Sequence, residues 1–126
     1  MLYLDNSATT SVLPEVRDKM LLYLTEDYGN PSSKYYHLAI NAKNAVENAR
    51  QYVAKIISAK ETEIIFTSGA TESNNLILKG VADYYSSKGK HIITSKVEHK
   101  SVLDICKFLE TKGFQITYLD VDTYGR

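Results

Sequence analysis

The sequence predicts an α/β fold in which helices cover a parallel or mixed sheet in three layers. Two observations carry this prediction: the second half of the chain alternates apolar runs with helical patterns, and those runs have the length of short strands. Strands are expected over residues 63–66, 91–94 and 114–119, and helices over 71–86 and 100–112. Strand–helix–strand order favours parallel pairing, so the carboxyl ends of the strands should meet at one edge of the sheet.

The first half of the chain predicts two further helices joined by a loop. Residues 2–4 form a short extended segment, and Pro14 suits the first position of a helix because its fixed φ fits there. That helix should run to about Asp27, and its apolar stripe consists of Val16, Met20, Leu21 and Leu24. Gly and Pro punctuate a loop at 28–33, and a long helix is expected over 35–57.

Composition limits the class of protein. The 126 residues fit one ordinary domain, and fifteen basic and fifteen acidic side chains cancel, which excludes strong attraction to nucleic acid or to an anionic membrane. No apolar run reaches membrane-spanning length. The single cysteine cannot form an internal disulfide and fits a reducing compartment, so we expect a cytoplasmic protein.

The turn after the first expected strand is the strongest candidate site. The small residues Thr67–Thr71 join the apolar run Ile64–Phe66 to a helix, which places free backbone N–H groups and hydroxyls at a helix N-terminus. Such a terminus attracts anions, and a phosphate is the expected ligand. The turn lacks the Gly-Lys-Ser/Thr ending of a Walker loop, and a plain strand-to-helix connection explains the residue types equally well.

His99 is the second candidate, because it follows the second expected strand and should lie on the same sheet edge as Ala70 and Thr71. A histidine there can stack on a planar ring or transfer a proton near neutral pH. A surface histidine at a helix start explains the residue at least as well. Ser101 and Asp104 fit a capping box for the helix that follows.

Cys106 is expected in the core and not at a reactive site. It shares a helical stripe with Val102, Ile105 and Leu109, and burial makes a thiol less reactive. The three histidines and Cys106 have no metal-ligand spacing, so no metal site is predicted. The ten tyrosines are spread along the chain without a basic stripe, which favours packing over nucleic-acid stacking.

Four segments carry a resemblance that extends over essentially the whole chain. They are Tyr3–Thr10, Gly29–Ser33, Thr67–Asn75 and Ser95–Val102. In this order and spacing they resemble the N-terminal portion of the NifS/IscS-type cysteine desulfurases, which are pyridoxal-phosphate enzymes of the class V aminotransferase group. The stretch Lys34–Ala39 departs from the family pattern by one extra residue, which leaves the subgroup open.

The resemblance implies pyridoxal 5'-phosphate as the cofactor and assigns three site residues. Ala70 and Thr71 match the residues that hold the cofactor phosphate. His99 matches the histidine that stacks on the cofactor ring and assists proton transfer, which makes it the catalytic residue of this portion. Residues 1–13 would belong with the small domain of a fold type I enzyme, and residues 14–126 would form part of its large, cofactor-binding domain.

The implied reaction converts L-cysteine to L-alanine and leaves the sulfur on the enzyme as a persulfide. A homodimer is implied, with a sulfur acceptor or an iron–sulfur scaffold protein as a further partner. The family's cofactor-binding lysine and sulfur-accepting cysteine match no position up to Arg126, so the 126 residues alone are expected to be inactive. The alternatives are another class V pyridoxal-phosphate enzyme, such as a selenocysteine lyase or an aminotransferase, and a non-catalytic remnant or binding module.

Overall fold

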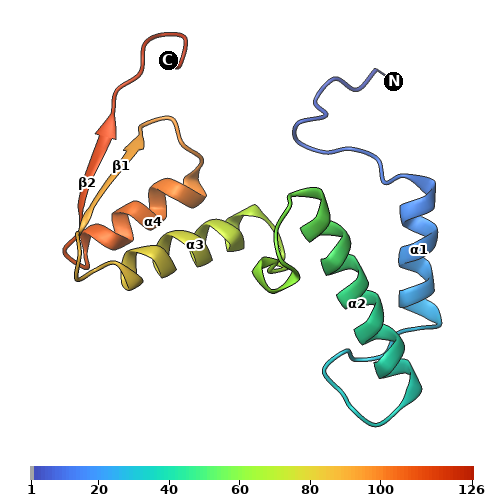
Figure 1. Cartoon of the computed structure of the whole chain (residues 1–126). Coiled ribbons are helices and arrows are strands. Elements are labelled where there is room, and N and C mark those ends of the chain that lie inside the picture. Colours follow the sequence, from blue (N-terminus) through green and yellow to red (C-terminus); the bar gives the residue numbers. More distant parts are fainter. Residues whose placement is uncertain (1) are drawn as a thin grey trace. The chain divides into compact units, whose positions relative to one another are not determined.

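The computed structural model describes residues 2–126, which form two units that divide after Ile65. The described residues contain four α-helices and a two-stranded parallel sheet, so the predicted α/β class is confirmed (Figure 1). Helices alone make up the first half of the chain, and helices alternate with strands in the second half.

The first unit is helical. Helix α1 (Pro14–Thr25) begins at Pro14 as predicted, because the ring presets φ and the missing N–H is not needed in the first turn. Helix α2 (His37–Ile56) is rich in alanine, the best helix former, and its buried residues are Ala39, Ala42 and Ala54. Both helices lie within two residues of their predicted bounds.

The loop between α1 and α2 is held by its own residue types. A Cβ atom on Gly29 would lie 2.1 Å from the Leu38 carbonyl oxygen, so only glycine allows the loop to pass this close to the start of α2. Asn30 accepts the Ser32 N–H through its side chain at 2.9 Å, and Asn41 donates to Asp27 at 3.1 Å. The Gly29–Ser33 motif therefore has a structural role in fixing the entry to α2.

The predicted strand at 63–66 is wrong. A 3-10 turn, η1 (Glu61–Glu63), occupies its first residue, and the residues after it are extended but belong to no strand. The Ile64 carbonyl accepts from the Arg50 side chain instead of from a neighbouring strand. A strand needs a partner for its backbone groups, and within residues 2–126 the two strands β1 (His91–Ser95) and β2 (Gln115–Leu119) pair only with each other.

The second unit places two helices beside a parallel strand pair. Helix α3 (Ala70–Tyr84) leads to strand β1 (His91–Ser95), and helix α4 (Lys100–Glu110) leads to strand β2 (Gln115–Leu119). The strands pair in parallel from His91↔Gln115 to Ser95↔Leu119. These two helices and two strands confirm the predicted elements to within two residues at each end.

A small hydrophobic core holds the second unit together. Ala82 of α3 packs with Ile105 and Leu109 of α4, and three partly buried residues adjoin them: Leu78, Ile92 and Phe114. Helices α3 and α4 run along each other beside the strand pair (Figure 1). This packing holds the later turns of α3 against α4.

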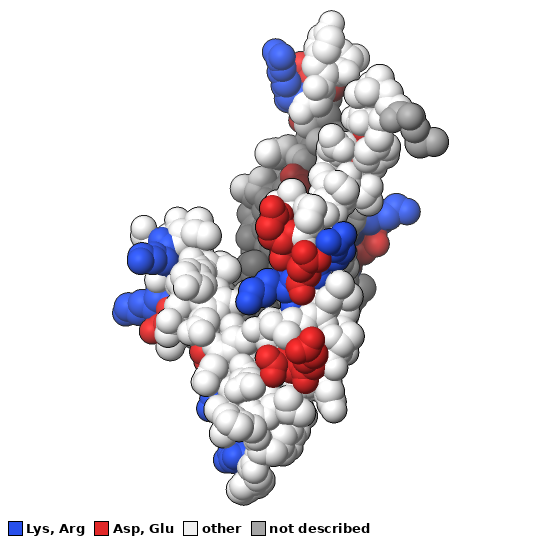
Figure 2. Space-filling view, turned by 90° about the vertical axis from the view of Figure 1, so that its right-hand side faces the viewer, with Lys and Arg blue, Asp and Glu red and all other residues white. Residues whose placement is uncertain are grey.

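Many large apolar side chains stay exposed. Helix α1 has no buried residue, and the four members of its predicted apolar stripe are exposed by 48–69%. Basic and acidic side chains are interspersed among wide uncharged areas on the face shown in Figure 2. The sequence therefore contains apolar faces that residues 2–126 do not cover.

Candidate functional site

The turn at the start of α3 is built from small residues. Gly69 is the N-cap of α3 with extended backbone angles and has no side chain to cap the helix. The Thr67 hydroxyl lies 2.7 Å from the Ser73 hydroxyl and 3.3 Å from the Gly69 carbonyl oxygen. The first N–H groups of a helix have no acceptor inside it, so Ala70 and Thr71 begin a positively polarised helix end.

One carboxylate lies in the same turn. Glu72 accepts the Ser68 N–H at 2.6 Å, and hydrogen bonds from Ser68 hold the pKa of the Glu72 carboxyl below its ordinary value of 4.5. The carboxylate is fully exposed, so it closes the turn without being buried in it. Sequence reasoning missed this contact, although Glu in the first turn of a helix is a known signal for it.

His99 caps the N-terminus of α4. Its Nδ1 atom accepts the Ser101 N–H at 3.1 Å and lies 2.9 Å from the Ser101 hydroxyl oxygen. Histidine can cap a helix because Nδ1 is as many bonds from the backbone as the side-chain oxygen of asparagine. The predicted capping box of Ser101 and Asp104 is therefore wrong: Ser101 lies inside the helix, and Asp104 pairs with Lys107 at 3.7 Å.

Ser101 connects α4 to α3. Its hydroxyl accepts from the Asn74 amide at 2.8 Å, and the residue is only 8% exposed. Neither residue was singled out from the sequence as part of a site. The available signal was that Asn74 and Ser101 each lie four residues from a core position, Leu78 and Ile105, where a polar residue needs a partner.

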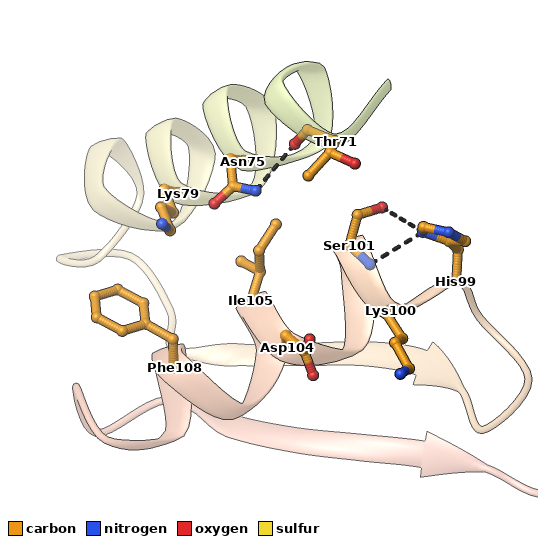
Figure 3. A pocket seen from close by; sticks show the side chains of 9 residues that line it. All are labelled: Thr71, Asn75, Lys79, His99, Lys100, Ser101, Asp104, Ile105 and Phe108. Atoms are coloured by element: carbon orange, nitrogen blue, oxygen red, sulfur yellow. Dashed lines mark hydrogen bonds between the residues drawn. The ribbon is translucent and has the colours of Figure 1, made fainter. Parts of the chain in front are cut away.

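The N-terminal ends of α3 and α4 border one open groove of about 420 Å³. Thr71, Asn75 and Lys79 line it from α3, and His99 and residues of α4 line it from the other side (Figure 3). Of the three predicted site residues, Thr71 and His99 thus reach the same groove. Ala70 begins α3 beside Thr71 but does not line the groove.

Cys106 is a core residue, as predicted. It is 1% exposed, and burial raises the pKa of its thiol, with smaller contributions from the negative charges of Glu110 and Glu98. Within residues 2–126 no three or more His, Cys, Asp or Glu side chains are grouped so that they could bind a metal ion. None of the helices in this part of the chain is both long enough and apolar enough to span a bilayer.

The sequence and the fold match those of known proteins. The model of the aminotransferase class-V family matches residues 2–126, so the chain belongs to this family. Relatives that share 54–55% of their aligned residues with this chain are cysteine desulfurases. The chain is 55% identical over 126 residues to the cysteine desulfurase IscS of Shewanella sp. strain MR-4, an alignment that covers 98% of this chain and 31% of the relative.

Solved structures agree with this assignment. A NifS-like protein superposes with a TM-score of 0.86 at 44% identity, covering 94% of this chain and 32% of that protein. The structure of SspA in complex with cysteine gives a TM-score of 0.84 at 43% identity and covers 93% of this chain and 33% of that protein. The chain therefore corresponds to the N-terminal portion of these relatives and spans about a third of their length.

Proposed function

We propose that this chain is the phosphate-anchoring portion of a cysteine desulfurase, in which L-cysteine gives L-alanine and sulfur held as an enzyme persulfide. Full-length enzymes of the class-V aminotransferase family use pyridoxal 5'-phosphate. The observation that carries the proposal is that Thr71 and His99 border one groove, in a chain 55% identical to IscS. A phosphate contact and a ring contact of one cofactor would then be close together.

The residues of the groove fit this cofactor. A phosphate monoester is an anion with several acceptor oxygens, and the N-terminus of the 15-residue helix α3 offers N–H groups, a positive dipole end and the Thr71 hydroxyl. The imidazole of His99 is flat and held by two contacts to Ser101, which suits stacking on a planar ring. The Glu72 carboxylate is the one acidic group hydrogen-bonded in the turn. It accepts the N–H of Ser68, so the N–H groups of Ala70 and Thr71 are left for a ligand.

Each residue has a defined part in this proposal. Ala70 and Thr71 would hold the phosphate through their backbone N–H groups and the Thr71 hydroxyl. His99 would lie against the ring and hold a proton at Nε2, because Nδ1 is occupied by Ser101. The cofactor, when bound, supplies an electron sink for the bond changes at the substrate's α-carbon. These groups bind and orient; the proposal assigns the remaining chemistry to other parts of the protein.

The proposal extends to the full-length protein. The exposed apolar faces and the two-strand sheet suit the first half of a larger three-layer domain, with residues 1–13 joining a smaller domain and a second copy forming a homodimer. Cys106 is buried, so the sulfur-accepting cysteine is expected elsewhere. A sulfur acceptor or iron–sulfur scaffold protein would take the persulfide sulfur. The single cysteine supports a cytoplasmic location.

A chimaera tests the proposal. These 126 residues replace the matching portion of the Shewanella sp. strain MR-4 enzyme, and cofactor affinity and alanine release from cysteine are measured. Thr71→Val keeps the shape but removes the hydroxyl, so we expect cofactor affinity to fall about 10- to 100-fold, the effect of losing one hydrogen bond to a charged group. Thr111→Val, which removes a hydroxyl bonded to Phe108 at the far end of α4, is the matched control and should leave affinity unchanged.

His99→Asn is the second variant, because asparagine can still cap α4 but has no ring. We expect cofactor affinity and alanine release to fall without loss of fold. Unchanged affinity in both Thr71→Val and His99→Asn would contradict the proposed site. Cofactor binding without alanine release would indicate a different class V reaction, and a chimaera that binds no cofactor would indicate a non-catalytic chain.

A further inference from the structure

A chain of hydrogen bonds joins His99 to the opposite helix. The amide of Asn74 on α3 donates to the Ser101 hydroxyl at 2.8 Å, and that hydroxyl lies 2.9 Å from Nδ1 of His99. Ser101 is buried, and its side chain faces the His99 ring across the first turn of α4 (Figure 3). The capping bond from the Ser101 N–H reaches the same Nδ1 atom at 3.1 Å.

The donors and acceptors of this chain fix where the proton on the ring lies. Asn74 donates to the Ser101 oxygen, so the single Ser101 hydroxyl proton is left to point toward Nδ1. The Ser101 N–H also points at Nδ1. Two donors facing one nitrogen require it to be an acceptor, so the neutral ring carries its proton on Nε2. No residue between 2 and 126 is hydrogen-bonded to Nε2 of His99, which leaves that N–H for a ligand.

We propose that Asn74 and Ser101 are positioning residues that hold His99 in its Nε2–H tautomer and fix the plane of its ring. The inference rests on the proposed function, in which this ring lies against the cofactor. Capping alone ties the ring to α4. The Asn74 link ties it also to α3, the helix whose first residues would hold the phosphate, so that both cofactor contacts share one rigid pair of helices.

Burial alone does not account for this arrangement. A buried hydroxyl needs one partner, and the Asn74 amide already provides it. A hydroxyl that serves only to satisfy Asn74 could point its own proton at any nearby carbonyl of its helix, as the Thr111 hydroxyl does with Phe108. The placement of the Ser101 oxygen 2.9 Å from Nδ1 is the feature that calls for a further role.

The tautomer can be measured directly in the chimaera without cofactor. Selective ¹⁵N labelling of histidine and magic-angle-spinning NMR separate Nε2–H from Nδ1–H, and the His99 signal is assigned by its loss in His99→Asn. We expect Nε2–H in the unmodified chimaera. Ser101→Ala removes one donor to Nδ1, so the ratio of Nε2–H to Nδ1–H should fall about fivefold, the effect of one neutral hydrogen bond. Ser101→Thr keeps the hydroxyl and should restore the ratio.

A second variant acts from α3. In Asn74→Asp the ionised carboxylate accepts the Ser101 hydroxyl proton and draws it away from Nδ1, so the same ratio should fall. Asn75→Asp places an equal charge one residue further along α3. The Asn75 amide donates to the Thr71 carbonyl, a bond that the aspartate loses, and no hydrogen bond joins residue 75 to Ser101, so the ratio should stay unchanged. This pair of variants also covers the case in which Ser101→Ala fails to fold.

Two results would overturn the inference: a Nδ1–H ring in the unmodified chimaera, or a ratio that does not change in Asn74→Asp. The inference and the proposed function fail differently. If the tautomer ratio responds to Asn74→Asp but cofactor affinity is unchanged in both Thr71→Val and His99→Asn, the positioning residues are supported and the cofactor site is rejected. If cofactor affinity depends on Thr71 but the tautomer ratio does not respond to Asn74→Asp, the cofactor site is supported and the positioning role of Asn74 and Ser101 is rejected.

Discussion

The 126 residues, expressed alone, should fail to form a stable monomer, because they leave too much surface in water. Their accessible surface is 10,486 Å² for a mass of 14.2 kDa. A compact monomer of this mass exposes about 6,800 Å², and two separate compact units of half the mass expose about 8,200 Å² together. The chain therefore exposes about 2,300 Å² more than two separate compact units would.

The excess area is large in energetic terms. If about 57% of it is apolar, as on an ordinary protein surface, the hydrophobic stabilisation left unused is about 30 kcal/mol at about 25 cal/mol per Å². Ordinary domains are stable by only about 5–15 kcal/mol in total. We expect a broad thermal transition by circular dichroism and sedimentation as oligomers or aggregates. The chimaera, which covers these faces, should melt cooperatively and is the control.

Cys106 provides an independent test of whether the isolated chain is stably folded. It is the single cysteine and is 1% exposed, so a thiol reagent reports directly on opening of α4. In the isolated chain we expect its labelling rate in buffer to approach the rate in denaturant. A sharp melt of a sedimenting monomer, with Cys106 labelled many times more slowly in buffer than in denaturant, would refute the argument from surface area.

Three further predictions concern the chimaera. His99→Ala removes the cap of α4 and should lower the free energy of unfolding by about 1 kcal/mol. His99→Asn keeps a capping side chain and should lose much less stability. Equal losses for the two variants in urea titrations would contradict the capping role. Hydrogen bonds from Ser68 lower the pKa of the Glu72 carboxyl, so its stabilising contribution is present above pH 4.5 and is lost as pH falls through the lowered pKa. Glu72→Gln should therefore be less stable than the parent at neutral pH and equally stable in strong acid. Urea titrations at each pH measure this difference. The Tyr118 hydroxyl is buried and makes no well-formed hydrogen bond within residues 2–126, and burial together with the neighbouring Glu110 carboxylate raises its pKa. Tyr118→Phe should therefore raise the free energy of unfolding by up to about 1 kcal/mol, and a loss of stability would show that the hydroxyl donates to Glu110.

Local signals in the sequence were sufficient for the helices and for two strands. Pro14 marks the start of α1, and apolar spacing marks α3 and α4, because these features act within a few residues. The strand at 63–66 could not be judged in this way. An apolar run becomes a strand only when another strand pairs with it, and no partner for this run lies within residues 2–126.

For the site, too, local features could be predicted from the sequence and contacts between distant residues could not. Thr71 and His99 could be placed together from strand–helix order, since both follow extended segments and begin helices. The contact between Asn74 and Ser101 could not, because it spans 27 residues and depends on how α3 packs on α4. A polar residue four positions from a core residue is a usable signal, but it does not say which partner satisfies it.

The structure changes the meaning of His99. From sequence alone a helix-start histidine and a cofactor-stacking histidine are competing explanations, yet Nδ1 serves the cap while Nε2 has no bond to any described residue. The cap therefore leaves Nε2 available for the cofactor contact that we propose, so the two explanations are compatible. The turn and the ring of the proposed site both lie within the unit Phe66–Arg126, and the hydrogen bonds that hold the ring are made inside this unit. Because the Ser101 contacts do not depend on a ligand, His99 should be in its Nε2–H form before any cofactor binds.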